Sequence, residues 1–233
     1  MSTKKWDVYV YGDVNIDIVI PGVEKFPEPG QEDEVSVMET FVGGGAALFT
    51  LGVGKLGLRP VFQGEVGDDC YGELIRSKFR ESHVDDSLLA VSKELKTGIS
   101  LSFTNAKDRS FLTYRGTNEK ISISNVDLEK VKEAAHIHVT GYMGSINHNE
   151  GSIAVKDGTL YQAAPYTVEA VDTTGAGDSF NAGFVYGFLR GKTMEECLKC
   201  GNGCGALSVT ALGGNTGFPT EEKLEAFIRS YEA

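Results

Sequence analysis

The sequence predicts an α/β fold in which a doubly wound, mostly parallel β-sheet is accompanied by a second, small β-sheet. Two observations lead to this fold class. Apolar, β-branched segments alternate with segments of helical periodicity, which is the pattern that parallel sheets produce. Two other stretches show the strict alternation of half-buried strands beside turn residues, which is typical of an antiparallel sheet. Because 233 residues with 41% hydrophobic content can fill one sizeable core, we expect a single domain over 1–233.

Each element is predicted from its local pattern. β-Rich apolar runs predict core strands over 6–20, 59–67 and 136–142. A further short strand is predicted over 167–171, just before the two long helices. Gly/Ala-rich or amphipathic stretches that follow turn or capping residues predict helices: 43–58, 71–82, 125–135, 177–190, 193–209 and 219–233. Alternating stretches predict the small sheet over 32–39 and 97–115, and a separate hairpin over 151–165. The many Gly and Ala residues of the two long helices predict that these helices pack closely.

The charge balance and the lack of long apolar runs narrow the function classes. The formal net charge of −11 argues against a surface that binds nucleic acid or an anionic membrane. No apolar run approaches the roughly 20 residues that span a bilayer, and the start lacks the apolar block of a signal peptide. We therefore expect a cytoplasmic protein that acts on small molecules.

The cysteines and histidines show no spacing that indicates a metal site. Cys197, Cys200 and Cys204 recur at helical spacing, and we interpret them as small buried thiols on one helix face. His136 and His138 alternate along a predicted strand, and we interpret them as structural.

Residues 172–180, DTTGAGDSF, place three small residues at the start of a predicted helix and a carboxylate in its first turn. The first N–H groups of a helix lack internal partners, and the helix dipole adds about half a positive charge there. Because Gly175, Ala176 and Gly177 carry no bulky side chain, a phosphate or a phosphoryl group in transfer can approach these amides. Asp178 would then accept the proton of an attacking hydroxyl. The residues alone leave a second interpretation open, in which Asp178 only interacts favourably with the dipole.

The stretch DTTGAGDSFNAGFV resembles the C-terminal motif of the ribokinase-like, PfkB-type carbohydrate kinases. The resemblance implies that Asp178 is the catalytic base, that Gly175, Ala176 and Gly177 form an anion hole, and that Gly175 and Gly177 contact the nucleotide. It also implies that Asp172 and Thr174 lie near a monovalent-cation site that K⁺ can fill. CGNGCGALSVTALGG resembles the segment that passes the adenine, which implies that Asn202 is a neighbour of ATP.

The N-terminal half carries the second part of the resemblance. YGDVNIDIVI is similar to the first strand of the family, where Asn15 and Asp17 would hydrogen-bond sugar hydroxyls. VGGGAALFTLGVGKLG resembles the N-terminal family motif, in which Gly43 and Gly44 let the backbone approach the substrate. The stretches 32–39 and 97–115 resemble the lid, a small sheet that closes over the sugar and through which family members often dimerise.

Two departures from the family pattern stand out. Leu48 occupies a position where the family usually has Asn, which removes one expected sugar contact. Family members are also longer, and a central segment is missing near 146–151. Either that segment of a longer protein is left out of the 233 residues, which we favour, or the chain is a shortened variant that completes its core by association. Residues 147–150, NHNE, match the family's Mg²⁺-placing Asn-x-x-Glu pattern, and we interpret this match as accidental.

The resemblance predicts an ATP-dependent kinase that phosphorylates a hydroxymethyl group of a sugar or sugar-like molecule, with Mg²⁺ bridging the ATP phosphates. Leu48 keeps a nucleoside kinase of the same family as an alternative. The missing segment keeps a second alternative, a non-catalytic relative that only binds sugar or nucleotide.

Overall fold

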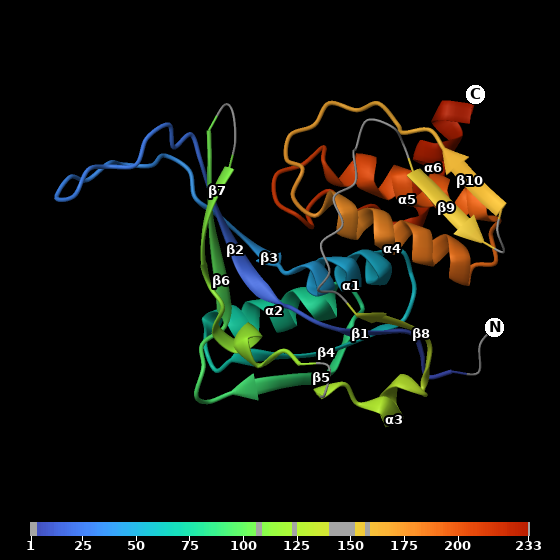
Figure 1. The fold of residues 1–233 in the computed structure, drawn as a ribbon, viewed down its shortest axis with the longest axis horizontal. Coiled ribbons are helices and arrows are strands. Elements are labelled where there is room, and N and C mark those ends of the chain that lie inside the picture. Colours follow the sequence, from blue (N-terminus) through green and yellow to red (C-terminus); the bar gives the residue numbers. More distant parts are fainter. Residues whose placement is uncertain (1–3, 106–108, 123–124, 140–151, 157–158, 233) are drawn as a thin grey trace.

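The computed structural model describes residues 4–105, 109–122, 125–139, 152–156 and 159–232. Within these ranges, a parallel sheet with the strand order β5-β4-β1-β8 forms the base of the molecule (Figure 1). Its strands are β1 (Trp6–Tyr11), β4 (Pro60–Gly67), β5 (Asp85–Ser92) and β8 (Ala134–Val139). A second sheet has the order β3-β2-β6-β7, and β9 (Ser152–Lys156) pairs with β10 (Thr159–Ala163). The predicted class, α/β with a parallel sheet and a second sheet, is confirmed.

The chain winds outward from β1 in both directions. It passes to β4 and β5 on one side of β1 and later returns to β8 on the other side. The strand order therefore reverses at β1, and open parallel sheets bind ligands outside the carboxyl ends of the strands at such a reversal. Because β1 ends at Tyr11, the residues that follow it occupy this position.

The single strand predicted over 6–20 is in fact two strands that belong to different sheets. Residues Gly12–Val14 separate β1 from β2 (Asn15–Pro21). β1 lies between β4 and β8, whereas β2 lies between β3 and β6. The apolar run continues across the break because each half is buried in its own sheet, so the local pattern did not reveal the change of partner.

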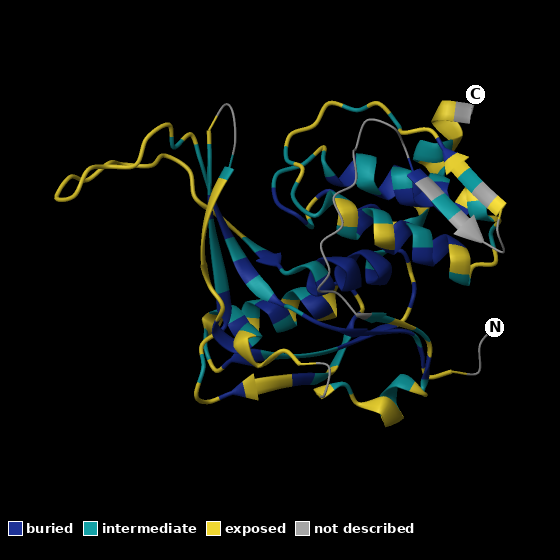
Figure 2. Cartoon of the chain, viewed as in Figure 1, coloured by how far each residue is buried: buried dark blue, intermediate teal, exposed yellow. Residues whose placement is uncertain are grey.

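The second sheet, which we call the lid, is built from β2, β3 (Glu39–Gly43), β6 (Gly98–Thr104) and β7 (Arg109–Tyr114). The hairpin predicted over 97–115 is confirmed, since β6 and β7 pair antiparallel. The strand predicted over 32–39 is wrong, because residues 32–38 belong to no strand and β3 starts only at Glu39. Residues 32–38 are exposed on a projecting loop and have no sheet face against which to bury their apolar positions (Figure 2).

Helices α1 (Gly45–Lys55) and α2 (Cys70–Glu81) pack on the parallel sheet, and α4 (Ala176–Leu189) packs on α1 (Figure 1). The helices α5 (Met194–Ser208) and α6 (Glu221–Glu232) complete that layer. A Cβ on Gly183 would lie 2.4 Å from the Cys200 carbonyl oxygen, so only glycine permits this approach of α4 to α5. The predicted close packing is confirmed. Among the described residues, none of the helices combines the length and apolar character that a membrane crossing requires.

Two other predicted elements differ from the structure. The helix predicted over 125–135 is reduced to α3 (Leu128–Val131), because residues from Ala134 onward pair with β1 as β8. The strand predicted over 167–171 is not formed. Instead, Val171 and Asp172 donate their N–H groups to the Val209 carbonyl at the end of α5, at 2.7 and 3.1 Å. Without a neighbouring strand, this segment is held by a helix end.

Candidate active site

Three segments meet beyond the carboxyl end of β1: the start of β2, the N-terminus of α1 and the N-terminus of α4. A Cβ on Gly44, just before α1, would lie 2.7 Å from the Asp13 carbonyl oxygen. A Cβ on Gly175, just before α4, would lie 3.1 Å from a methyl group of Leu48 in α1. The site residues predicted from the two ends of the sequence are therefore brought together at the reversal of strand order, apart from Asn202.

The N-terminus of α4 is left open. Gly175 is the N-cap with φ of 73°, a left-handed conformation that favours glycine, and no side chain caps the helix. A Cβ on Gly175 would also lie 2.6 Å from the Gly214 carbonyl oxygen, whereas a Cβ on Gly177 would meet no atom within 4 Å. Among the described residues, the N–H groups of Gly177 and Asp178 have no hydrogen-bond acceptor. This arrangement offers unpaired donors beside free space, which is the chemistry of an anion site.

Asp178 projects from the first turn of α4 and is largely buried. Burial, together with the negative charge of Asp13, raises its pKa to about 7. Within the described part of the chain, its carboxylate has no hydrogen-bond or ion-pair partner. A carboxylate with this pKa is suited to take a proton near neutral pH, as a general base does.

Asn15 and Asp17 form the polar start of β2. The Asn15 side-chain amide donates to Asp17 Oδ1 at 2.7 Å. Burial raises the pKa of Asp17 to about 6, against the opposing effect of the Asn15 hydrogen bond and with smaller contributions from the charges of Asp13 and Asp172. A Cβ on Gly43 would lie 2.3 Å from the Asp17 carboxyl group, so only glycine accommodates this side chain. Gly43 and Gly44 thus allow the start of α1 to pack closely against the residues around the start of β2, beside the predicted sugar-binding residues Asn15 and Asp17.

The sequence analysis missed Asp13, which follows β1 directly. Its carboxylate accepts hydrogen bonds from Gly45 N at 2.9 Å and Ala46 N at 3.1 Å and so caps α1. Its charge also raises the pKa values of Asp17 and Asp178. The available signal was an aspartate at the end of the first core strand, followed by a glycine-rich helix start.

Asp172 and Thr174, predicted near a cation, do lie together. Asp172 Oδ1 accepts hydrogen bonds from Thr174 N at 2.9 Å and Thr174 Oγ1 at 2.7 Å. The third partner was not foreseen: Arg109, from the lid, donates to Asp172 Oδ1 at 3.3 Å and to Thr174 Oγ1 at 2.5 Å. Burial alone would raise the pKa of Asp172, but the hydrogen bonds from Thr174 and Gly213 and the Arg109 charge hold it below its usual range.

Leu48 and Asn202 both contact other parts of the fold. Leu48 is buried against Gly175 and Gly214, where it supports the start of α4 from behind. Asn202, on α5, donates its amide to the carbonyl oxygens of Ala163 and Ala164, at 3.2 and 2.8 Å, at the end of β10. Its role beside ATP remains a prediction.

The remaining sequence interpretations concern metals and thiols. Cys197, Cys200 and Cys204 are buried thiols, as interpreted, and none of them forms a disulfide within the described part of the chain. His138 stacks on Phe49 with ring centroids 3.7 Å apart, and burial lowers its pKa to about 4, which fits a structural role. Among the described residues, no group of three His, Cys, Asp or Glu side chains could hold a metal ion. Residues 147–150 lie outside the described ranges.

An open helix N-terminus beside a carboxylate of raised pKa, at the strand reversal of a parallel sheet, is an arrangement that could bind an anionic group next to a proton acceptor. Comparison gives the family: the chain belongs to the pfkB family carbohydrate kinases, whose profile matches residues 5–149 and 148–221. It is thus a phosphotransferase of the carbohydrate kinase type, and its specific substrate is not determined by this match.

Similar proteins illustrate the range of the family. An ATP-dependent ribose-1-phosphate kinase of Halopiger xanaduensis is 24% identical, over 93% of this chain and 96% of the relative. The Methanocaldococcus jannaschii nucleoside kinase, a ribokinase family member, has a similar fold, with a TM-score of 0.79 at 18% identity, over 98% of this chain and 100% of that one. A putative ribokinase II of E. coli, solved with ATP and Mg²⁺, reaches a TM-score of 0.82 at 18% identity, over 97% and 99%.

These comparisons also confirm that the chain lacks a central segment. The alignment with the Halopiger kinase runs over 287 positions, more than the 233 residues present here. The family profile likewise matches in two parts that meet at residues 148 and 149, inside the region where the sequence predicts the loss.

Proposed function

We propose that the chain transfers the γ-phosphoryl group of ATP to a hydroxymethyl group of a sugar or sugar-like small molecule. The observation that carries this proposal is the pairing of Asp178, whose pKa is about 7, with the unpaired amides of the helix turn from which it projects. A base and an anion site within one helical turn place the deprotonated hydroxyl and the transferring phosphoryl group side by side.

In this mechanism Asn15 and Asp17 hold the sugar. The Asn15 amide is already committed to Asp17 Oδ1, which fixes the orientation of both side chains. Asp17 Oδ2 and the Asn15 carbonyl oxygen remain as acceptors for neighbouring hydroxyl groups of a polyol. Asp178 then removes the proton from the hydroxyl that attacks phosphorus, and the amides of Gly177 and Asp178 receive the negative charge of the phosphoryl group.

ATP and Mg²⁺ fit this site in different ways. The free space at Gly177 and its unpaired N–H suit the terminal phosphate of ATP. The described residues form no cluster of three metal-binding side chains, so Mg²⁺ would be held mainly by the phosphates and water, as is common for this ion. When bound, Mg²⁺ neutralises phosphate charge and aligns the γ-phosphoryl group.

A coupled assay for ADP release tests the proposal across acceptors: ribose, fructose, ribose 1-phosphate, 2-keto-3-deoxygluconate and adenosine. We expect turnover with a sugar that is abolished in Asp178→Asn and retained in the surface control Asp68→Asn. A preference for adenosine would instead establish the nucleoside kinase alternative, for which the hydrocarbon of Leu48 at an Asn position is the supporting feature. Binding of sugar and ATP without turnover would establish the non-catalytic alternative.

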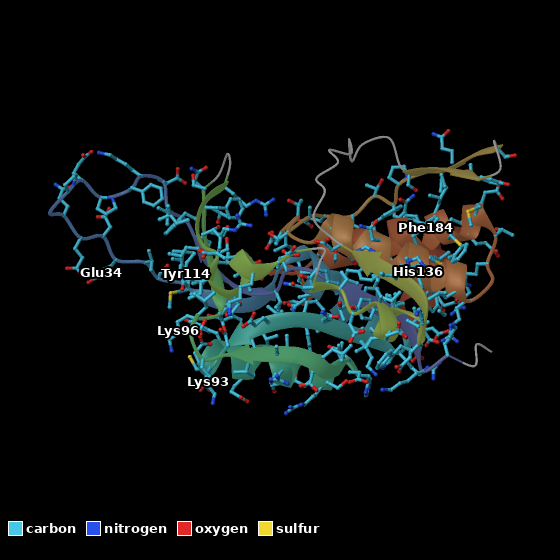
Figure 3. The ribbon with its side chains drawn as sticks, turned by 60° about the horizontal axis from the view of Figure 1, so that its bottom comes forward. Glu34, Lys93, Lys96, Tyr114, His136 and Phe184 are labelled. Carbon is cyan, nitrogen blue, oxygen red and sulfur yellow. The ribbon has the colours of Figure 1, made fainter. Side chains whose placement is uncertain are left out.

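We also propose that two copies associate through the lid. Apolar side chains are exposed at both edges of this sheet: Phe111, Leu112 and Tyr114 on β7, and Met38 just before β3. Figure 3 shows Tyr114 on this sheet. Exposed apolar groups gathered on one sheet indicate an interaction surface. Light scattering on the purified protein should give twice the chain mass, and Leu112→Lys should return it to the monomer.

A further inference from the structure

Arg109 connects the lid to the segment that leads into α4. It stands at the first position of β7, the strand that pairs antiparallel with β6. Its guanidinium donates to Asp172 Oδ1 at 3.3 Å, to Thr174 Oγ1 at 2.5 Å and to Thr173 Oγ1 at 2.8 Å. Three consecutive residues of the 172–174 segment are therefore bound to one lid side chain.

The Asp172 carboxylate has little capacity left for another cation. Its side chain is only 10% exposed. Oδ1 accepts from Thr174 N, Thr174 Oγ1 and Arg109, and Oδ2 accepts from Gly213 N at 2.9 Å. One guanidinium already balances this one carboxylate, so a K⁺ ion added beside them would place an uncompensated positive charge in a poorly solvated site. The residues present do not fit the monovalent cation that the family resemblance implies.

We propose that the Arg109 guanidinium is a built-in substitute for the monovalent cation, so that this kinase does not depend on K⁺. The proposal rests on the proposed function for its kinetic consequences only. Arg109 is a positioning residue, since it contacts the segment before the anion site rather than the amides of Gly177 and Asp178 themselves. Because the cation is carried by the lid, the position of the lid and the shape of the anion site are coupled.

The coupling follows the chain. Asp172 holds Thr174 N and, through Oδ2, the N–H of Gly213 in the loop after α5. The next residue, Gly175, is the left-handed N-cap of α4 and packs against Gly214. Releasing Arg109 would leave the Asp172 charge partly buried and unbalanced, which favours a rearrangement of the segment that aims the first amides of α4.

A thermal melt without substrate tests the cation site directly. The wild-type protein should melt at the same temperature in KCl and in tetramethylammonium chloride of equal ionic strength. Arg109→Met should melt lower, and KCl should selectively recover about 2–4 °C. Arg80→Met is the matched control, because its exposed guanidinium pairs with Asp86 at 3.1 Å, Asp86 keeps Arg76 as a second partner, and the loss of Arg80 should therefore create no K⁺ preference. A K⁺-selective rise in the wild-type melting temperature would overturn the proposal.

Kinetics give the second readout. Wild-type turnover should change by less than about two-fold between the two salts, whereas Arg109→Met should lose about ten-fold in kcat and regain part of it with K⁺ or guanidinium. Wild-type activation by K⁺ of about ten-fold or more would overturn the proposal. If no acceptor is phosphorylated but the melts behave as expected, the kinase function fails and the cation inference stands. Melts without the expected K⁺ preference in Arg109→Met overturn the inference and leave the kinase function untouched.

Discussion

The N-termini of α1 and α4 both follow glycine-rich sequences, but a side chain accepts hydrogen bonds from the first N–H groups of α1 and none does so at α4. Both follow glycine-rich turns with glycines in left-handed or strained positions, Gly44 with φ of 92° and Gly175 with φ of 73°. At α1 the carboxylate of Asp13 accepts from the N–H groups of Gly45 and Ala46. At α4 no side chain caps the helix, and the acid of that turn, Asp178, accepts from none of its amides.

A glycine-rich helix start is therefore not by itself an anion site. At α1 the donors are used inside the fold, and the glycines serve close approach of the backbone to Asp13 and Asp17. At α4 the donors face free space at Gly177, so they remain available to a ligand. The predictions below test this contrast, starting with the largest expected effect.

Replacing the acid at α4 should have the largest effect. We expect Asp178→Asn to lower kcat by about 10²–10⁴-fold, because the amide cannot accept the proton of the attacking hydroxyl. The variant should also unfold at a higher temperature than the wild type at pH 8. The folded-state pKa of about 7 exceeds the ordinary aspartate value of 3.8, so ionisation weakens the folded state as pH rises between these two values.

Thermal melts across pH check the stability half of this prediction. The difference between Asp178→Asn and the wild type should shrink as pH falls from 8 towards 4, because the wild-type carboxyl then takes up its proton in the folded state and approaches its unfolded-state pKa of 3.8. A constant difference across pH would mean that the side chain is not held in the desolvated environment described here. Asp68→Asn, at an exposed position, is the control for the loss of one carboxylate elsewhere on the protein.

Substitutions of two glycines at the start of α4 should affect stability and activity differently. Gly175→Ala forces a Cβ to 2.6 Å from the Gly214 carbonyl and a side chain into φ of 73°, and should destabilise the protein by about 1–3 kcal/mol. Gly177→Ala meets no atom and gains helix propensity, so stability should stay equal or rise by up to about 1 kcal/mol. Its methyl group narrows the anion site, so kcat/KM for ATP should fall.

Urea unfolding and steady-state kinetics on both variants provide the measurement. If Gly177→Ala keeps full activity, the free space beside it is not where phosphate binds. If Gly175→Ala is as stable as the wild type, the left-handed N-cap is not required for the turn.

The sequence was most informative where structure follows from local chemistry. The helices α2, α4 and α5 lie within one or two residues of their predicted bounds, because amphipathic spacing and features such as the Thr193–Glu196 capping box are written in adjacent residues. The break between β1 and β2 and the unpaired 167–171 segment were missed, because strand formation depends on a partner elsewhere in the chain.

The same division applies to the site. Asp178, Gly175 and Gly177 belong to one contiguous motif, so their common position at the start of α4 could be predicted from the sequence. Arg109 and Asp13 were missed because their contacts connect residues far apart: Arg109 is 63 positions from Asp172, and Asp13 is 33 positions from Ala46. No local pattern marks such a pairing.

The smallest effect should come from Asp13, which links the two helix starts. Asn at position 13 keeps one acceptor for α1 but removes the negative charge of Asp13. That charge is the second cause of the raised pKa of Asp178, and burial is the first. The base of the wild-type enzyme must be ionised, so kcat/KM should rise with pH through about 7. In Asp13→Asn this rise should move to lower pH by a fraction of a unit, while the loss of one cap hydrogen bond costs about 0.5–1 kcal/mol of stability. A rise that stays in place would show that burial alone sets the pKa of Asp178, and a rise that moves to higher pH would show that Asp13 stabilises the ionised base rather than opposing it. In the first case the two helix starts would be electrostatically separate, and the contrast between a filled and an open N-terminus would have to be explained by each turn independently; in the second case they would be coupled with the opposite sign.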